Sequence, residues 1–137
     1  MVERKYEDLS IGDSASLKQT ASTEYVAAMA ELTGDKNPVH LDDEYARSSI
    51  FGRKIAHGLF CDGMVSRMLG TDLPGLGTIY MEKHIRFKAP VYIDDEIETT
   101  LTIVELTDEK RLVDLSFECK KADGTVVAKG NVRVKLP

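Results

Sequence analysis

An acid and an imidazole lie five residues apart in a short polar segment, at Asp35 and His40. Between them, Pro38 lacks a backbone donor and keeps Asn37 out of the α region, so the segment is predicted to be irregular. Composition alone favours a plain loop, in which Asp35 and Asn37 make an Asx-type turn and His40 is a surface residue. The alternative is that Asp35 and His40 converge on one substrate as an acid/base pair, which proton-transfer chemistry commonly uses.

A second candidate is Gly58, which ends the stretch Ala56-His57-Gly58. A glycine near the start of an apolar helix leaves free N–H groups along a favourable dipole, and these suit a carbonyl oxygen that gains negative charge. The alternative is that Gly58 only permits tight packing of the helix against a sheet. His57 also has two interpretations: a second acid/base group or, as is more common at such a turn, a residue that orients the backbone.

Two polar residues, Asp62 and Ser66, follow on the same predicted helix. On an ideal helix Ser66 lies about 80° around from Gly58, so both can face one cavity, although its hydroxyl can equally bond back to the helix backbone. Asp62 lies one turn after Gly58 among apolar residues, where an unpaired carboxylate is costly. We therefore expect Asp62 to have a pairing partner or to reach water, with catalysis as the alternative.

The elements that must position these residues divide the chain by periodicity. Residues 22–70 follow a helical spacing of apolar side chains, and residues 78–134 alternate. The helical half should begin with a helix that Ser22 or Thr23 caps and that ends at Gly34, where a left-handed residue is expected.

Two further helices are expected before the sheet. Asp42 could cap a short helix over residues 43–48. A long helix is predicted over residues 55–69, with apolar side chains around most of its circumference, which is typical of a buried helix.

The alternating half predicts an antiparallel sheet. Its strand segments are residues 79–88, 97–103, 113–120 and 126–134, with an early strand over residues 13–20. In the first of these, positions 79, 81, 85 and 87 are apolar, which places Tyr80 on the polar face. Short turns at residues 107–110 and at Asp123-Gly124 predict hairpins. One apolar face must be covered, and only the long helix is apolar enough, so we predict an α+β fold in one domain over residues 1–137, with one curved sheet wrapped around a central helix.

Composition disfavours several classes of protein. Lys plus Arg is 18 and Asp plus Glu is 23, for a net charge of −5, and there is no Trp, so no nucleic-acid partner is expected. No stretch approaches the roughly 20 apolar residues of a membrane span, so no membrane partner is expected. The first residues carry no apolar leader, and Cys61 and Cys119 are interpreted as reduced core thiols. We therefore expect a cytoplasmic protein.

Together, Asp35-Lys36-Asn37-Pro38-Val39-His40 and Ala56-His57-Gly58 resemble the hydratase motif of the MaoC-like dehydratases, a family similar to (R)-specific enoyl-CoA hydratases of the hot-dog fold. The resemblance covers nearly the whole chain and includes Arg86-Phe87-Lys88-Ala89-Pro90. It implies a hot-dog fold and a hydro-lyase with no metal and no cofactor, coenzyme A being part of the substrate. It also implies at least a homodimer, or a dimer of dimers.

The implied reaction is the reversible syn addition of water to trans-2-enoyl-CoA, which gives (R)-3-hydroxyacyl-CoA. Asp35 and His40 would hold the water, and the Gly58 amide would bind the thioester carbonyl. The resemblance implies contacts with the acyl-CoA substrate at four further positions, namely Asn37, Pro38, His57 and Ser66.

Three other activities stay open from the sequence: a 3-hydroxyacyl-acyl-carrier-protein dehydratase, an acyl-CoA thioesterase on the same fold, and an acyl-CoA-binding module without turnover. The acyl chain length stays open too. So does the pathway, which could be polyhydroxyalkanoate precursor supply, fatty acid oxidation or fermentative butyrate formation.

Overall fold

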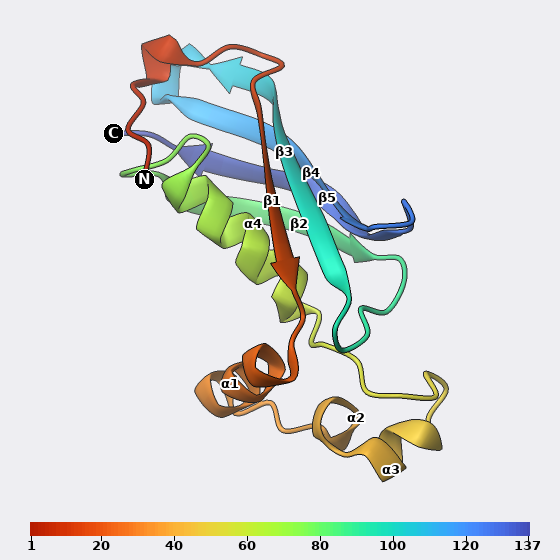
Figure 1. Ribbon diagram of the computed structural model, residues 1–137. Helices are drawn as coiled ribbons and strands as arrows, with labels where there is room; N and C mark the ends of the chain where they lie inside the picture. Colours follow the sequence, from red (N-terminus) through yellow and green to blue (C-terminus); the bar gives the residue numbers. More distant parts are fainter.

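A five-stranded sheet curves around one long helix in the computed structural model, which describes residues 1–137 (Figure 1). The strands are β1 (Ser14–Thr20), β2 (Ile79–Phe87), β3 (Glu96–Thr107), β4 (Leu112–Lys121) and β5 (Val126–Lys135). They lie in the order β1-β3-β4-β5-β2, and every neighbouring pair is antiparallel. The five expected strands and the α+β hot-dog architecture are confirmed.

Both predicted hairpins are present. A 3-10 turn, η2 (Asp108–Lys110), connects β3 to β4, and Arg111 follows it with φ 52°. Gly124 turns the chain between β4 and β5 with φ 88°, a conformation that glycine adopts without a steric penalty. The Asp-Gly signal therefore predicted the turn correctly.

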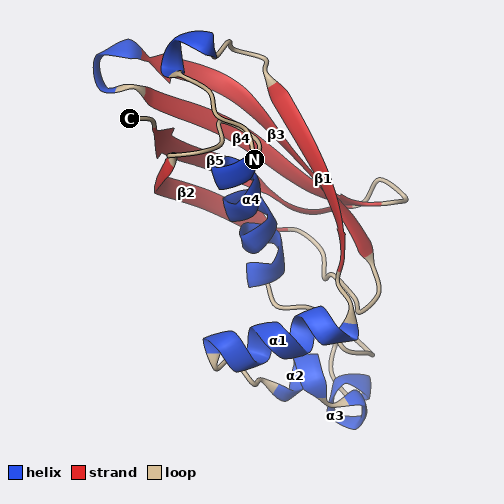
Figure 2. Cartoon of the chain, turned by 60° about the vertical axis from the view of Figure 1, so that its left-hand side comes forward, coloured by secondary structure: helices blue, strands red, loops and turns tan.

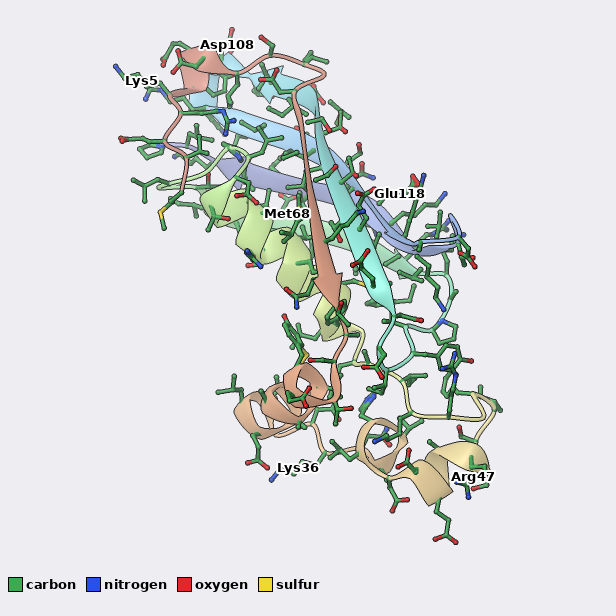
Figure 3. The ribbon with its side chains drawn as sticks, viewed as in Figure 1. Lys5, Lys36, Arg47, Met68, Asp108 and Glu118 are labelled. Carbon is green, nitrogen blue, oxygen red and sulfur yellow. The ribbon has the colours of Figure 1, made fainter.

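The central helix, α4 (Leu59–Thr71), fills the concave face of the sheet. Phe60, Val65 and Met68 on this helix are fully buried, and Figure 3 shows Met68 between the helix and the strands. The expectation of a buried helix is confirmed, because these side chains form one core with the inward positions of β3, β4 and β5.

The start of this helix differs from the prediction, which placed it at residue 55. Ile55 pairs with Tyr92 in an isolated bridge, and the Ala56 amide donates to the Val91 carbonyl at 2.8 Å. These bonds hold the chain extended up to the turn, so Gly58 is the N-cap of α4 rather than an interior residue.

A layer of three helices lies beyond one end of the sheet (Figures 1 and 2). It consists of α1 (Thr23–Thr33), α2 (Pro38–Leu41) and α3 (Asp43–Arg47). The Ser22 hydroxyl caps α1 by accepting from the Tyr25 amide at 3.1 Å, and Gly34 ends it with φ 78°, as predicted.

The segment over residues 35–40 was predicted to be irregular throughout, and this is wrong for residues 38–40, which belong to α2. Pro38 is the first residue of α2, where its missing N–H has no partner to lose and its φ suits the helix. Asn37, with ψ 124°, stays outside the α region as the following proline requires.

The strand β2 forms one free edge of the sheet and carries a bulge between Tyr80 and Glu82. The extra residue shifts the alternation, so Tyr80 and Lys83 lie opposite Val134 and Val132, which face the core. Tyr80 was predicted on the polar face, and this was wrong: it and Lys83 both face α4.

Two observations complete the fold. Cys61 and Cys119 are buried and form no disulfide, as expected for core thiols. The hydrogen bond between the two thiols, together with burial, raises the pKa of Cys61. None of the helices is both long and apolar enough to cross a membrane.

Candidate active site

The loop that joins α1 to α2 positions Asp35 at the surface. The Asp35 amide donates to the Thr33 hydroxyl at 3.1 Å, and the Asp35 carboxylate accepts from the Asn37 amide at 3.3 Å. The expected Asx-type turn is therefore present. It fixes the loop while leaving the carboxylate exposed.

The helix α2 carries His40 inward, where 9% of its surface is exposed. The sequence interpretation of His40 as a surface residue is therefore wrong. His40 Nδ1 lies 2.7 Å from the Ile55 carbonyl oxygen. Because a carbonyl only accepts, Nδ1 carries the proton and donates, which leaves the lone pair on Nε2. His40 is thus held in the tautomer that a general base needs.

His57 connects the two motifs. Its Nε2–H donates to the Asp35 carbonyl at 2.9 Å, and its ring stacks on that of His40 with centroids 3.8 Å apart and an interplanar angle of 24°. Of its two sequence interpretations, orientation of the backbone is the one that this hydrogen bond supports. Its Nδ1 is buried without a partner.

The structure brings Asp35 and His40 together, with one polar side-chain atom of each and one of His57 all within 4.8 Å of one another. A carboxylate and an imidazole lone pair at this spacing can hold a water molecule and move its proton. The three atoms are also close enough together to ligate one metal ion.

Gly58 lies directly beside this cluster because it follows His57. Its amide donates no hydrogen bond within the protein, and it points from the N-terminal end of α4. A Cβ at this position would lie 3.0 Å from the ring of Phe87, closer than side chains normally pack. The glycine therefore permits tight packing, as one of its two sequence interpretations proposed, and its amide is free to donate. Its bond to a substrate carbonyl stays a prediction.

The other predicted contact residues have different surroundings. The Asn37 side chain caps α2 by accepting from the Val39 amide at 3.3 Å, and Pro38 begins that helix. Both residues are exposed, and their contact with substrate stays a prediction. Ser66 makes no hydrogen bond to the helix backbone and instead faces a cavity.

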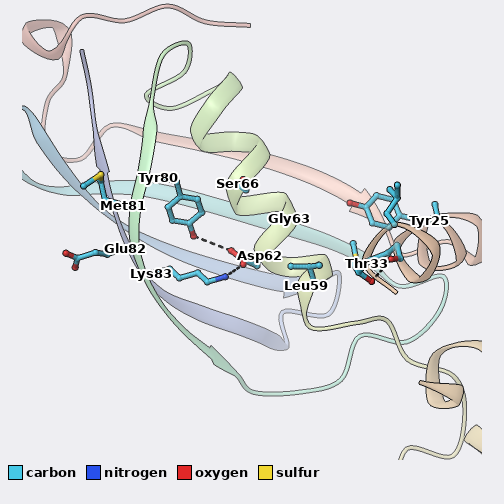
Figure 4. Close-up of a pocket in the computed structure, with 13 residues that line it drawn as sticks. Tyr25, Thr33, Leu59, Asp62, Gly63, Ser66, Tyr80, Met81, Glu82 and Lys83 are labelled. Carbon is cyan, nitrogen blue, oxygen red and sulfur yellow. Dashed lines mark hydrogen bonds and ion pairs between the residues drawn. The ribbon is translucent and has the colours of Figure 1, made fainter. Parts of the chain in front are cut away.

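That cavity has a volume of about 820 Å³ and lies between α1, α4 and β2 (Figure 4). Asp62 stands in its wall, almost buried, and forms an ion pair with Lys83. The Tyr80 hydroxyl donates to the same carboxylate at 3.2 Å. The expected partner of Asp62 is thus confirmed.

Tyr80 and Lys83 were missed as lining residues of this cavity. Burial, followed by the Asp62 charge and its hydrogen bond, raises the pKa of Tyr80, so its hydroxyl stays a donor. The sequence held one signal for Lys83. Position 83 alternates in step with the apolar positions of its strand but carries a charge, and Asp62 is likewise a charged residue among the apolar positions of its helix. Two opposite charges at such positions predict a pair.

Residues 10–123, most of the chain, match the family described as MaoC like domain. The chain belongs to this family. The MaoC-like resemblance seen in the two motifs is therefore confirmed.

Relatives of this MaoC-like protein have named activities. It is 42% identical over 132 residues to a 3-hydroxybutyryl-CoA dehydratase of Methylorubrum extorquens, covering 96% of this chain and 83% of the relative. It is 41% identical over 132 residues to an (R)-specific enoyl-CoA hydratase of Rhodospirillum rubrum, covering 96% and 91%.

Solved structures give the same result for the fold. The (R)-hydratase from Aeromonas caviae involved in PHA biosynthesis superposes with a TM-score of 0.92 at 34% identity, covering 96% of this chain and 99% of that chain. An unliganded R-hydratase from Pseudomonas aeruginosa superposes with a TM-score of 0.91 at 32% identity, covering 96% and 84%.

Proposed function

We propose that this MaoC-like protein is a hydro-lyase that reversibly hydrates trans-2-enoyl-CoA to (R)-3-hydroxyacyl-CoA. The observation that carries the proposal is the convergence of Asp35 with the free Nε2 of His40, beside the unbonded amide of Gly58. The names of its relatives support the same reaction.

In the proposed mechanism, the Gly58 amide donates to the thioester carbonyl oxygen and stabilises the negative charge that develops there. Asp35 and His40 hold one water molecule over the double bond. As the water oxygen bonds to C3, one water proton passes to the Asp35–His40 pair, and the pair returns one proton to C2 on the same face. The atoms of water are thereby added across the double bond.

This mechanism needs only proton transfer and one oxyanion donor. We therefore propose that the enzyme works without a metal or cofactor, coenzyme A being a part of its substrate. His57 would act through the two other residues, because its hydrogen bond fixes the Asp35 backbone and its ring supports His40.

The test is the absorbance of the enoyl-thioester band with purified protein and crotonyl-CoA, followed by chiral analysis of the product. We expect the band to decrease and (R)-3-hydroxybutyryl-CoA to form. Asp35→Asn and His40→Gln should each lower kcat by about 10²–10⁴-fold. Asp43→Asn, an exposed acid on the neighbouring α3, is the matched control and should retain activity.

Activity near the wild-type level in both Asp35→Asn and His40→Gln would reject this assignment. Release of free thiol from saturated acyl-CoA would favour a thioesterase. Binding of acyl-CoA without turnover would favour a binding module. A carrier-protein substrate has one observation in its favour, namely 33% identity over 132 residues to a mitochondrial 3-hydroxyacyl-acyl-carrier-protein dehydratase of Arabidopsis thaliana. Competition between crotonyl-CoA and the crotonyl carrier protein distinguishes the two substrates.

We further propose that two copies pair through β2 into a homodimer, which could assemble further into a dimer of dimers. In support, β2 is bonded on one side only, and three of its apolar side chains are more than half exposed, namely Ile79, Met81 and Phe87. Light scattering measures the mass, and a monomer would contradict the proposal.

The buried, unpaired state of both cysteines suits a reducing compartment, so we propose a cytoplasmic location. Fluorescent tagging of the chain in cells tests it. The relative from A. caviae takes part in PHA biosynthesis, and supply of polyhydroxyalkanoate precursors is the pathway that we propose first.

A further inference from the structure

The cavity between α1, α4 and β2 touches the candidate active site at two points. Thr33, whose hydroxyl accepts from the Asp35 amide at 3.1 Å, lies in its lining. So does Leu59, which directly follows Gly58. A thioester whose carbonyl oxygen meets the Gly58 amide therefore lies next to this cavity.

The wall of the cavity nearest the sheet is charged. Asp62 lies one helical turn beyond Gly58, about 6 Å along the axis of α4. Its side chain is 12% exposed, whereas that of Lys83 is 48% exposed, so the pair joins a buried group to a hydrated one. Figure 4 shows both side chains and Tyr80 meeting in the gap between the helix and the strand.

An alkyl chain gains affinity only where it meets apolar surface, by about fourfold for each buried methylene. Methylenes that reach the Asp62–Lys83 pair lose this gain, and they also strip water from the Lys83 ammonium. A chain of four carbons ends close to the thioester, whereas a chain of eight carbons is long enough to reach the charged wall, which begins about 6 Å from Gly58 along α4.

We propose that the Asp62–Lys83 ion pair, held in place by Tyr80, restricts this enzyme to short acyl chains such as the four-carbon thioester. The inference rests on the proposed function, because it assumes that the cavity receives the acyl part of an enoyl-CoA. Asp62 and Lys83 are specificity-determining residues in this proposal and take no part in the proton transfer.

The experiment compares kcat/KM for crotonyl-CoA and trans-2-octenoyl-CoA in the wild type and in two double variants. Asp62→Asn with Lys83→Gln removes both charges at nearly constant volume, and Asp62→Ala with Lys83→Met makes the wall apolar. Double variants are used because loss of Lys83 alone would leave an unpaired, nearly buried carboxylate.

We expect the wild type to favour crotonyl-CoA by at least about tenfold, because the longer chain must strip water from the Lys83 ammonium. The apolar variant should reduce this preference at least about tenfold, mainly through a lower KM for the octenoyl substrate. The Asn/Gln variant should have a smaller effect in the same direction. Asp114→Asn with Arg133→Gln is the matched control, because it removes an ion pair of 2.8 Å on the outer face of the sheet.

An equal kcat/KM for both chain lengths in the wild type, or a preference that both Asp62/Lys83 variants leave unchanged, would overturn the inference. If crotonyl-CoA is not hydrated at all, the proposed function fails instead. Calorimetric binding of butyryl-CoA and octanoyl-CoA, which cannot be hydrated, then still decides the inference. Octanoyl-CoA binding as tightly as butyryl-CoA to the wild type would contradict it, and weaker binding that the apolar variant restores would support it.

Discussion

The candidate active site and the cavity wall next to it are held in place by different kinds of contact. At the active site, His40 and His57 each donate to a backbone carbonyl, so the chain itself fixes their rings. In the wall, Asp62 is held by two side chains from another element, Lys83 and Tyr80. The wall therefore depends on contacts between side chains, whereas the geometry of the active site depends on the position of the backbone.

The largest effect should come from a change that disturbs the backbone at the active site. Gly58→Ala places a Cβ 3.0 Å from the Phe87 ring, so the helix start and its free amide must shift. We expect kcat for crotonyl-CoA to fall by about 10²–10³-fold, the usual cost of losing one oxyanion donor.

Gly70→Ala is the matched control on the same helix, since a Cβ there has no neighbour within 4 Å. It should retain activity and gain up to about 1 kcal/mol in the free energy of unfolding. Equal activities of the Gly58→Ala and Gly70→Ala variants would show that the Gly58 amide has no role in turnover.

A smaller effect is expected from His57→Phe, which keeps a ring against His40 but removes the donor to the Asp35 carbonyl. We expect kcat to fall by up to about 10²-fold because Asp35 is displaced, with little change in KM. The free energy of unfolding should fall by about 1 kcal/mol. His84→Gln, on the exposed part of β2, is the control, and an unchanged kcat in His57→Phe would contradict the positioning role.

A change in the wall should affect stability and spare turnover of the shortest substrate. Tyr80→Phe removes the hydrogen bond of 3.2 Å to Asp62 and should cost about 1 kcal/mol in denaturant unfolding. Hydration of crotonyl-CoA should stay within about twofold, which is less than 1 kcal/mol. A loss of turnover as large as that of Gly58→Ala would show that the wall and the active site are not separable.

The smallest effect is a dependence of stability on alkaline pH. Burial, aided by the hydrogen bond to Asp108, raises the pKa of Tyr6 to about 12, and the pKa of Tyr80 is raised too. In the unfolded chain both phenols ionise near pH 10, so their contribution to stability is complete below about pH 10. The contribution of Tyr6 is lost as the pH rises through about 12, and that of Tyr80 is also lost at alkaline pH, as the pH rises through its raised pKa.

Phenolate absorbance measures this titration. Of five tyrosines in the chain, two should ionise late, and Tyr6→Phe and Tyr80→Phe should each remove one late transition. Five tyrosines that titrate together near pH 10 would contradict the prediction.

The same comparison explains how much of the molecule could be predicted from the sequence. The strands, both hairpins, the Ser22 cap and the Gly34 end of α1 depend on neighbouring residues, and the sequence predicted them. The pairing of Asp35 with His40 was an open alternative that the two motifs together favoured.

What could not be predicted depends on distant contacts. The first residue of α4 is set by the bonds of Ile55 and Ala56 to residues 91 and 92, and local helix propensity gives no information about them. The inward direction of Tyr80 depends on a bulge that the alternation of apolar residues did not reveal. The burial of His40 depends on its bond to the Ile55 carbonyl, 15 residues farther along the chain, about which the local sequence gives no information.

The bulge in β2 has a consequence for the newly made chain. In a single copy of the chain, β2 is an open sheet edge to which the strands of unfolded chains could bond. The bulge interrupts the regular spacing of its amides, and Lys83 places a charge on the inward face of the strand. A bulge and an inward-pointing charge are both features that disfavour the addition of foreign strands to a sheet edge, so a residue of the pocket wall also protects this edge from aggregation.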